Sequence, residues 1–107
     1  MAGQAGQDMV VGCLIRLRGE LDLMTADGVA VGLRAAIDTA VRRHARLDLA
    51  QLRFMDARGL AVLLGAAAYA RTRCSRWDVV GACAQVARVI AVTGAGRALG
   101  IGDARGL

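Results

Sequence analysis

The stretch RLDLAQLRFMDARGLAVLLGAAAYARTR, residues 46–73, decides the fold class because it holds a strand, a turn and a helix in succession. Two short segments, Arg46–Leu49 and Leu52–Met55, predict an interior strand and its continuation, which the polar stretch Gln51–Arg53 interrupts. A helix is predicted from about Ala57 to Arg73, and its core stripe falls at helical spacing. The stripe consists of Leu60, Leu63, Leu64 and Ala67.

A first strand and a first helix are predicted upstream of this unit. The segment Met9–Arg18 alternates apolar and polar residues with the period of a strand, and Gly19 is expected to end it. A loop, Glu20–Leu23, follows. Thr25 is a candidate N-cap, whose hydroxyl would accept an orphan N–H of a helix that runs to about Arg43. The buried stripe of this helix recurs every four residues: Val29, Leu33, Ile37 and Val41.

Further elements are predicted downstream. Trp77–Gly81 has the pattern of a third short strand, Ala84 to about Thr93 that of a third helix, and Leu99–Ile101 that of a short last strand. The glycine-rich run 94–100 resembles a dinucleotide fingerprint, but it follows a helix where that motif follows a strand. We therefore interpret it as a helix stop at Gly94 and a flexible turn.

Strands and helices alternate along the whole chain, which predicts an α/β fold. We expect a compact domain with a mostly parallel central sheet of about four strands and three to four helices. The length of 107 residues suits a single domain, with residues 1–8 frayed.

Composition narrows the classes of function. The chain is 56% hydrophobic and 21% charged, which is typical of a packed core. No apolar run reaches the roughly 20 residues that cross a bilayer, and the first residues lack the pattern of a secretory signal. A cytoplasmic protein without a membrane partner is expected. The net charge of +5 comes from arginines spread over the chain, and aromatic residues are few, so direct nucleic-acid binding is not expected.

Signatures of catalysis are scarce, so no enzyme is predicted. The single histidine, His44, has no partner nearby in sequence, and the single serine, Ser75, lies outside a nucleophile-elbow pattern. The three cysteines show no metal-type spacing, and neither a metal nor a cofactor is expected. Cys74 lies between Arg73 and Arg76, whose charges would lower the pKa of its thiol, which makes it a candidate redox residue. An inert exposed thiol is the alternative.

Two loops follow predicted strands and lead into helices. These loops, Leu21–Thr25 and Met55–Gly59, lie where ligands and partners usually dock in open α/β sheets. Asp56 either caps the second helix or contacts a partner. Because both loops lie at strand carboxyl ends, we expect them to form one contiguous surface with two acidic turns side by side.

Three segments in this order resemble one family. The segments Leu17–Asp22, Leu47–Leu49 and Phe54–Leu60 are similar to the STAS domain of bacterial anti-sigma factor antagonists, as is Thr93–Gly94 after the third helix. The resemblance covers roughly residues 10–101. It implies a compact α/β fold and a non-enzymatic role. The implied partner is an anti-sigma factor of the histidine-kinase-like ATPase type, which is also a serine kinase. Binding it would release a sigma factor.

The chain departs from the family at the phosphorylation loop. The family pattern Asp-Ser-Ser-Gly is replaced by Asp56-Ala57-Arg58-Gly59, so that Arg58 stands where the phosphorylated serine is expected. A Ser/Thr kinase cannot phosphorylate arginine. The resemblance therefore implies an antagonist-like regulator without the usual loop phosphorylation. Its partner-binding residues would be Asp22, Thr25, Asp56, Ala57, Arg58, Gly59 and Leu60.

Several versions of this function remain open at the level of sequence. The chain is an antagonist without a phosphorylation brake, or Arg58 anchors the acidic surface of a new partner, or control has moved to Thr25, Ser75 or Cys74. The rival from another class is a scaffold or transporter-accessory STAS domain, which assembles with like domains or with an ATPase. A monomer or weak dimer is expected for the antagonist.

Overall fold

Strands and helices alternate through the first six elements of the computed structural model, which describes residues 12–101. The elements are β1 (Gly12–Leu21), α1 (Ala26–Asp38), β2 (His44–Met55), α2 (Ala57–Arg73), β3 (Arg76–Val80), α3 (Ala84–Thr93) and α4 (Gly96–Leu99). The three strands form one sheet in the order β1-β2-β3, and both pairings are parallel. The predicted α/β class with a parallel sheet is confirmed.

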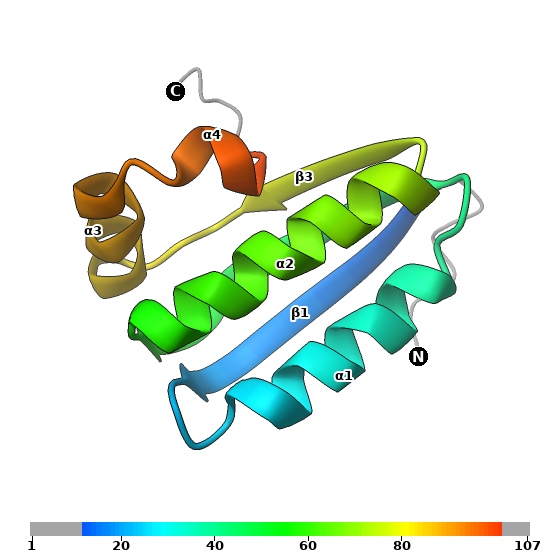
Figure 1. The fold of residues 1–107 in the computed structure, drawn as a ribbon. Helices are drawn as coiled ribbons and strands as arrows, with labels where there is room; N and C mark the ends of the chain where they lie inside the picture. Colours follow the sequence, from blue (N-terminus) through cyan, green and yellow to red (C-terminus); the bar gives the residue numbers. More distant parts are fainter. Residues whose placement is uncertain (1–11, 102–107) are drawn as a thin grey trace.

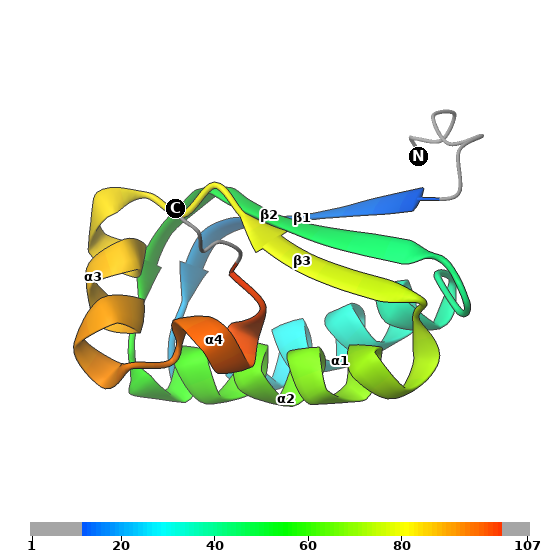
Figure 2. The same ribbon diagram turned by 90° about the horizontal axis from the view of Figure 1, so that it is seen from above.

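The two long helices cover a single face of this sheet. Figure 1 shows α1 and α2 side by side across the strands, and Figure 2 shows both helices beneath the sheet, with the other face open. The shorter α3 and α4 flank the β3 side. Large side chains fill the space between sheet and helices: Leu21, Leu33, Ile37, Leu47, Leu49, Leu52, Met55, Leu63, Val79, Val86 and Leu99.

Local sequence patterns located α2 and α3 correctly. The bounds of α2 match the prediction, and Leu60, Leu63 and Ala67 of its stripe are buried. Helix α3 ends at Gly94, which has a φ of 70° and caps the helix in the left-handed conformation. Both helices carry their boundary signals in the sequence itself, which explains the agreement.

Strand β1 continues beyond its predicted end at Arg18 because Gly19 does not end it. This glycine has a φ of 79° and lies where the register between β1 and β2 shifts, so the strand bulges and continues to Leu21. Strand β2 is likewise one continuous strand. A register shift between the pairs Arg16–Asp48 and Arg18–Gln51 absorbs its polar interruption. The predicted start of β1 at Met9 lies outside the described residues, as do residues 1–8.

The predictions for the end of α1 and for residues 95–101 are wrong. Helix α1 ends at Asp38, well before the predicted end at Arg43. Val41, which was expected in the buried stripe, is 42% exposed, and Ala40 is buried instead. The fourth strand is absent from the described part of the chain. Residues 96–99 form the short helix α4 in place of a flexible turn, and Ile101 makes only an isolated parallel bridge to Val79. Within residues 12–101 the sheet therefore has three strands, where about four were expected.

Candidate functional site

The loops at the carboxyl ends of β1 and β2 are in direct contact. The backbone N–H of Asp56 donates to the carbonyl of Leu21 at 3.2 Å, and the N–H of Leu23 donates to Asp56 Oδ2 at 3.2 Å. Figure 1 shows the starts of α1 and α2 at the same end of the sheet. The expected juxtaposition is confirmed, and we call residues 21–25 and 56–60 the two-loop surface.

The carboxylate of Asp56 has two structural roles at once. Its Oδ1 accepts the N–H of Gly59 at 2.9 Å and so caps α2, while its Oδ2 holds Leu23 of the other loop. The capping role considered from the sequence is thus present. Because one side chain joins both loops, their relative position depends on it.

We expect Asp56→Ala to lower the free energy of unfolding by about 1–2 kcal/mol, since the substitution removes a helix cap and a bond between loops. Urea denaturation would measure the loss. Asp27→Ala is the matched control, because Asp27 lies in the first turn of α1 with a side chain that is 95% exposed. Equal stabilities of the two variants would contradict the role given to Asp56.

The side chains of Asp22 and Thr25 fix the loop after β1 by hydrogen bonds to its backbone. Asp22 Oδ1 accepts the N–H groups of Met24 at 2.9 Å and Thr25 at 3.1 Å. The Thr25 hydroxyl donates to the carbonyl of Glu20 at 2.9 Å and accepts the N–H of Asp22 at 3.0 Å. It makes no hydrogen bond to α1, so the predicted hydroxyl cap is wrong. The hydroxyl turns back into the loop, where these bonds make the turn rigid.

The tip of this loop presents two apolar side chains that the sequence analysis did not select. Leu23 is 68% exposed and Met24 is 89% exposed. Both lie in a turn that is held by Asp22, Thr25 and Asp56. Exposed apolar side chains gathered on a fixed turn are typical of a contact surface. Their signal in the sequence was an apolar pair that no strand or helix pattern buries.

The four residues after Asp56 divide into two exposed and two buried ones. Ala57 and Arg58 are exposed, whereas Gly59 and Leu60 are buried. Arg58 Nη2 lies 3.3 Å from Asp27 Oδ1, and both side chains are largely solvated, so the pair is weak. The guanidinium is therefore available at the surface, while Gly59 lies close against Leu21 of the first loop and Leu60 lies in the core.

Helix α3 supports the site through a residue that sequence reasoning missed. Strand β3 pairs only with residues 44–48 of β2, which leaves the end of β2 without a neighbour on that side. Gln85 replaces this neighbour: its Oε1 accepts the N–H of Met55 at 2.9 Å, and its Nε2 donates to the carbonyl of Met55 at 3.1 Å. The thiol of Cys83 donates to the carbonyl of Leu52 at 3.2 Å. Gln85 of α3 and its N-cap residue Cys83 therefore fix the end of β2 that leads to Asp56.

Comparison with known proteins identifies the family to which this domain belongs. A family model described as "Mlab, STAS domain" matches residues 6–101. The chain belongs to the STAS-domain family. A segment of 52 residues is 44% identical to the "Anti-sigma F factor antagonist" of Paenibacillus polymyxa and covers 49% of this chain and 44% of that protein. The match thus spans less than half the length of this curated relative.

A solved structure is similar over most of the STAS domain. It is titled "Structure of the Anti-Sigma Factor Antagonist SpoIIAA in its Unphosphorylated Form" and superposes with a TM-score of 0.62 at 25% sequence identity. The similarity covers 80% of this chain and 75% of that one. The fold and the general family relationship inferred from the sequence motifs are therefore confirmed.

Two residues considered for chemistry lie far from the two-loop surface of this STAS domain. His44 is the first residue of β2, and its Nε2 is 2.6 Å from Asp78 Oδ2. Burial raises the pKa of the Cys74 thiol, with the nearby Cys13 thiol as a second cause. The lowered pKa predicted from the flanking arginines is wrong, because burial of the thiol decides the direction of the shift. A raised pKa leaves little reactive thiolate at Cys74.

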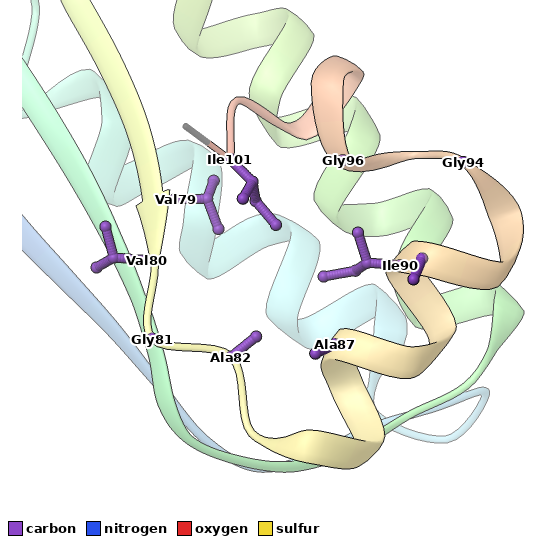
Figure 3. A pocket seen from close by; sticks show the side chains of 10 residues that line it. Val79, Val80, Gly81, Ala82, Ala87, Ile90, Gly94, Gly96 and Ile101 are labelled. Carbon is purple, nitrogen blue, oxygen red and sulfur yellow. The ribbon is translucent and has the colours of Figure 1, made fainter. Parts of the chain in front are cut away.

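One apolar pocket lies between β3, α3 and α4 (Figure 3). It has a volume of about 380 Å³, and none of its lining residues is titratable. Its side chains include Val79, Ile90 and Ile101. The pocket thus offers no acid, base or nucleophile. Among the described residues, no group of His, Cys, Asp or Glu could hold a metal ion, and no helix has the length and hydropathy needed to span a bilayer.

Proposed function

We propose that this STAS domain is an antagonist-like regulator that binds an anti-sigma factor and so releases a sigma factor in the cytoplasm. The observation that carries the proposal is the Asp56 carboxylate, which joins the loops after β1 and β2 into one fixed surface. The similarity to anti-sigma factor antagonists supports the general role. The proposed partner is an anti-sigma factor of the histidine-kinase-like ATPase type, and the domain acts by binding, without catalysis of its own.

The chemistry of the two-loop surface suits a protein partner. Leu23 and Met24 offer apolar contact area, while Asp22 and Arg58 add opposite charges to the two-loop surface. Apolar anchors surrounded by polar groups are typical of binding hot spots, because the anchors exclude water and the charges select the partner. Since hydrogen bonds within the loop hold the tip in place before binding, little conformational entropy is lost on association.

The second loop of this surface lacks the phosphorylatable serine that the family pattern leads us to expect. Residues 56–60 carry no hydroxyl group. A phosphate would add about −1.5 to −2 charge there, whereas Arg58 supplies a positive charge. We infer that phosphorylation of this loop does not release the partner, and that Arg58 is a lasting contact with it.

Reconstitution of the regulatory complex tests this function. The STAS domain is added to a purified complex of a sigma factor and an ATPase-type anti-sigma factor, and the products are separated by size-exclusion chromatography. The expected products are a STAS domain–anti-sigma factor complex and free sigma factor. An intact starting complex, together with a large homo-assembly in native mass spectrometry, would favour the scaffold or transporter-accessory alternative.

A second experiment tests the absence of the switch. With the same anti-sigma factor and ATP, we expect the wild-type chain to gain no phosphate, whereas Arg58→Ser gains one on the new hydroxyl. Intact-mass spectrometry measures the transfer, and Arg58→Ala controls for the loss of the guanidinium. Phosphate on Thr25 or Ser75 of the wild-type chain would contradict the proposal that phosphorylation does not control this antagonist.

A further inference from the structure

Two further loops lie at the end of the sheet opposite the two-loop surface, and backbone hydrogen bonds join them. The N–H of Arg42 donates to the carbonyl of Arg73 at 2.7 Å, and the N–H of Ser75 donates to the carbonyl of Arg43 at 2.9 Å. Figure 1 shows these connections, which follow α1 and α2, at the far end of both helices. We call residues 39–43 and 73–76 the basic end.

Four arginines and no acidic residue lie in the basic end: Arg42, Arg43, Arg73 and Arg76. Arg73 Nε is 3.7 Å from Asp38 Oδ1, and Arg76 Nε is 3.4 Å from Asp78 Oδ2. Within residues 12–101, Arg42 and Arg43 have no carboxylate at ion-pair distance, and both are exposed. Two guanidinium groups are therefore available to an external anion.

The carboxylates next to the basic end are already engaged. Asp38 Oδ1 accepts the Tyr69 hydroxyl at 2.6 Å in addition to its pair with Arg73, and Asp78 also contacts His44. The guanidinium carbons of Arg34 and Arg73 lie 4.5 Å and 4.3 Å from the centre of the Tyr69 ring. Arg34 thus extends the positive patch along the helices, and the acidic groups do not cancel it.

Although no membrane partner was expected from the sequence, we propose that the basic end binds the surface of an anionic phospholipid membrane. Guanidinium groups pair well with phosphate oxygens, and clustered basic residues are attracted to anionic headgroups. Val41 is 42% exposed beside Arg42 and Arg43 and can enter the headgroup region. In this orientation the two-loop surface faces away from the lipid and stays open to a protein partner.

The aromatic side chains argue against single-stranded nucleic acid as the occupant, since bases need free rings on which to stack. Trp77 is 8% exposed, and two arginines cover Tyr69. Phe54 is the penultimate residue of β2 and lies near the two-loop surface, far from the basic end. The basic end therefore offers charge without a stacking platform, as a lipid surface requires.

Co-sedimentation with vesicles tests the proposal. Each arginine near an anionic surface raises partitioning about fivefold, so Arg42→Asn/Arg43→Gln is expected to lower binding to vesicles that contain phosphatidylglycerol roughly 25-fold. Asparagine is chosen because residue 42 has a φ of 65°, which asparagine tolerates. The matched control, Arg53→Gln/Arg88→Gln, removes the same charge from exposed arginines elsewhere and should bind like the wild type.

The proposal also predicts that added salt weakens binding, and that vesicles of phosphatidylcholine alone are not bound. Failure of the wild type to bind the anionic vesicles would overturn it. Equal loss in both double variants would overturn it as well, because net charge alone would then explain the binding. Tight binding to a DNA duplex without vesicle binding would assign the basic end to nucleic acid instead.

Discussion

Replacement of Gly59 by alanine is expected to lower the free energy of unfolding by about 3 kcal/mol, the upper end of the usual range for overpacking. A Cβ atom at this position would lie 2.2 Å from the Leu21 carbonyl oxygen and 2.8 Å from Leu21 Cγ. That carbonyl also accepts the N–H of Asp56. Relief of the clash would therefore separate the two loops, and urea denaturation would show the loss of stability.

Gly65→Ala is the control for this substitution. Gly65 lies in the same helix and is exposed, and a Cβ atom added there would meet no side chain and no other element within 4 Å. Alanine there should raise stability by about 0.5–1 kcal/mol, because glycine costs a helix interior that amount. If Gly59→Ala were also neutral or stabilising, the close contact between α2 and the first loop would be refuted.

The charge reversal Arg58→Asp is expected to weaken binding to the anti-sigma factor by about 1–3 kcal/mol, the range of a central interface residue. Titration calorimetry measures this change. The fold should tolerate the substitution, since the solvated pair of Arg58 with Asp27 contributes little. An acidic residue in the first turn of α2 also interacts favourably with the positive end of the helix dipole.

Arg88→Asp provides the comparison for Arg58→Asp. Arg88 is exposed on α3, and its reversal changes the net charge by the same amount. We expect this variant to bind the anti-sigma factor like the wild type. Unchanged affinity of Arg58→Asp would remove Arg58 from the interface, and equal losses in the two variants would show long-range attraction in place of a contact.

Sequence reasoning predicted the juxtaposition of the two loops better than it predicted the hydrogen bonds within them. Both loops were predicted at strand ends, and the structure places them in contact. The Thr25 hydroxyl was assigned to the wrong hydrogen bond, because an N-cap residue can also bond backward into its own loop. Gln85 was missed because its partner, Met55, is 30 residues away in the chain.

Glycine signals show why some boundaries were wrong. Gly94 and Gly19 both adopt positive φ values, yet Gly94 ends a helix while Gly19 forms a bulge within a strand. Glycine permits a positive φ in a helix cap and in a strand bulge alike, so the residue alone does not show which of the two forms. The neighbouring strand β2 decides the outcome at Gly19, since its pairing with β1 continues as far as Met55.

The order of the first six strands and helices, the buried stripe of α2 and the presence of an arginine at position 58 were all determined by the sequence, because each depends on local periodicity or on residue identity. Tertiary structure alone decided that Asp56 would bond Leu23, that Gln85 would complete the end of β2, and that Cys74 would be partly buried. These contacts join segments far apart in the chain. Their geometry follows from how the helices pack on the sheet, which no local pattern specifies.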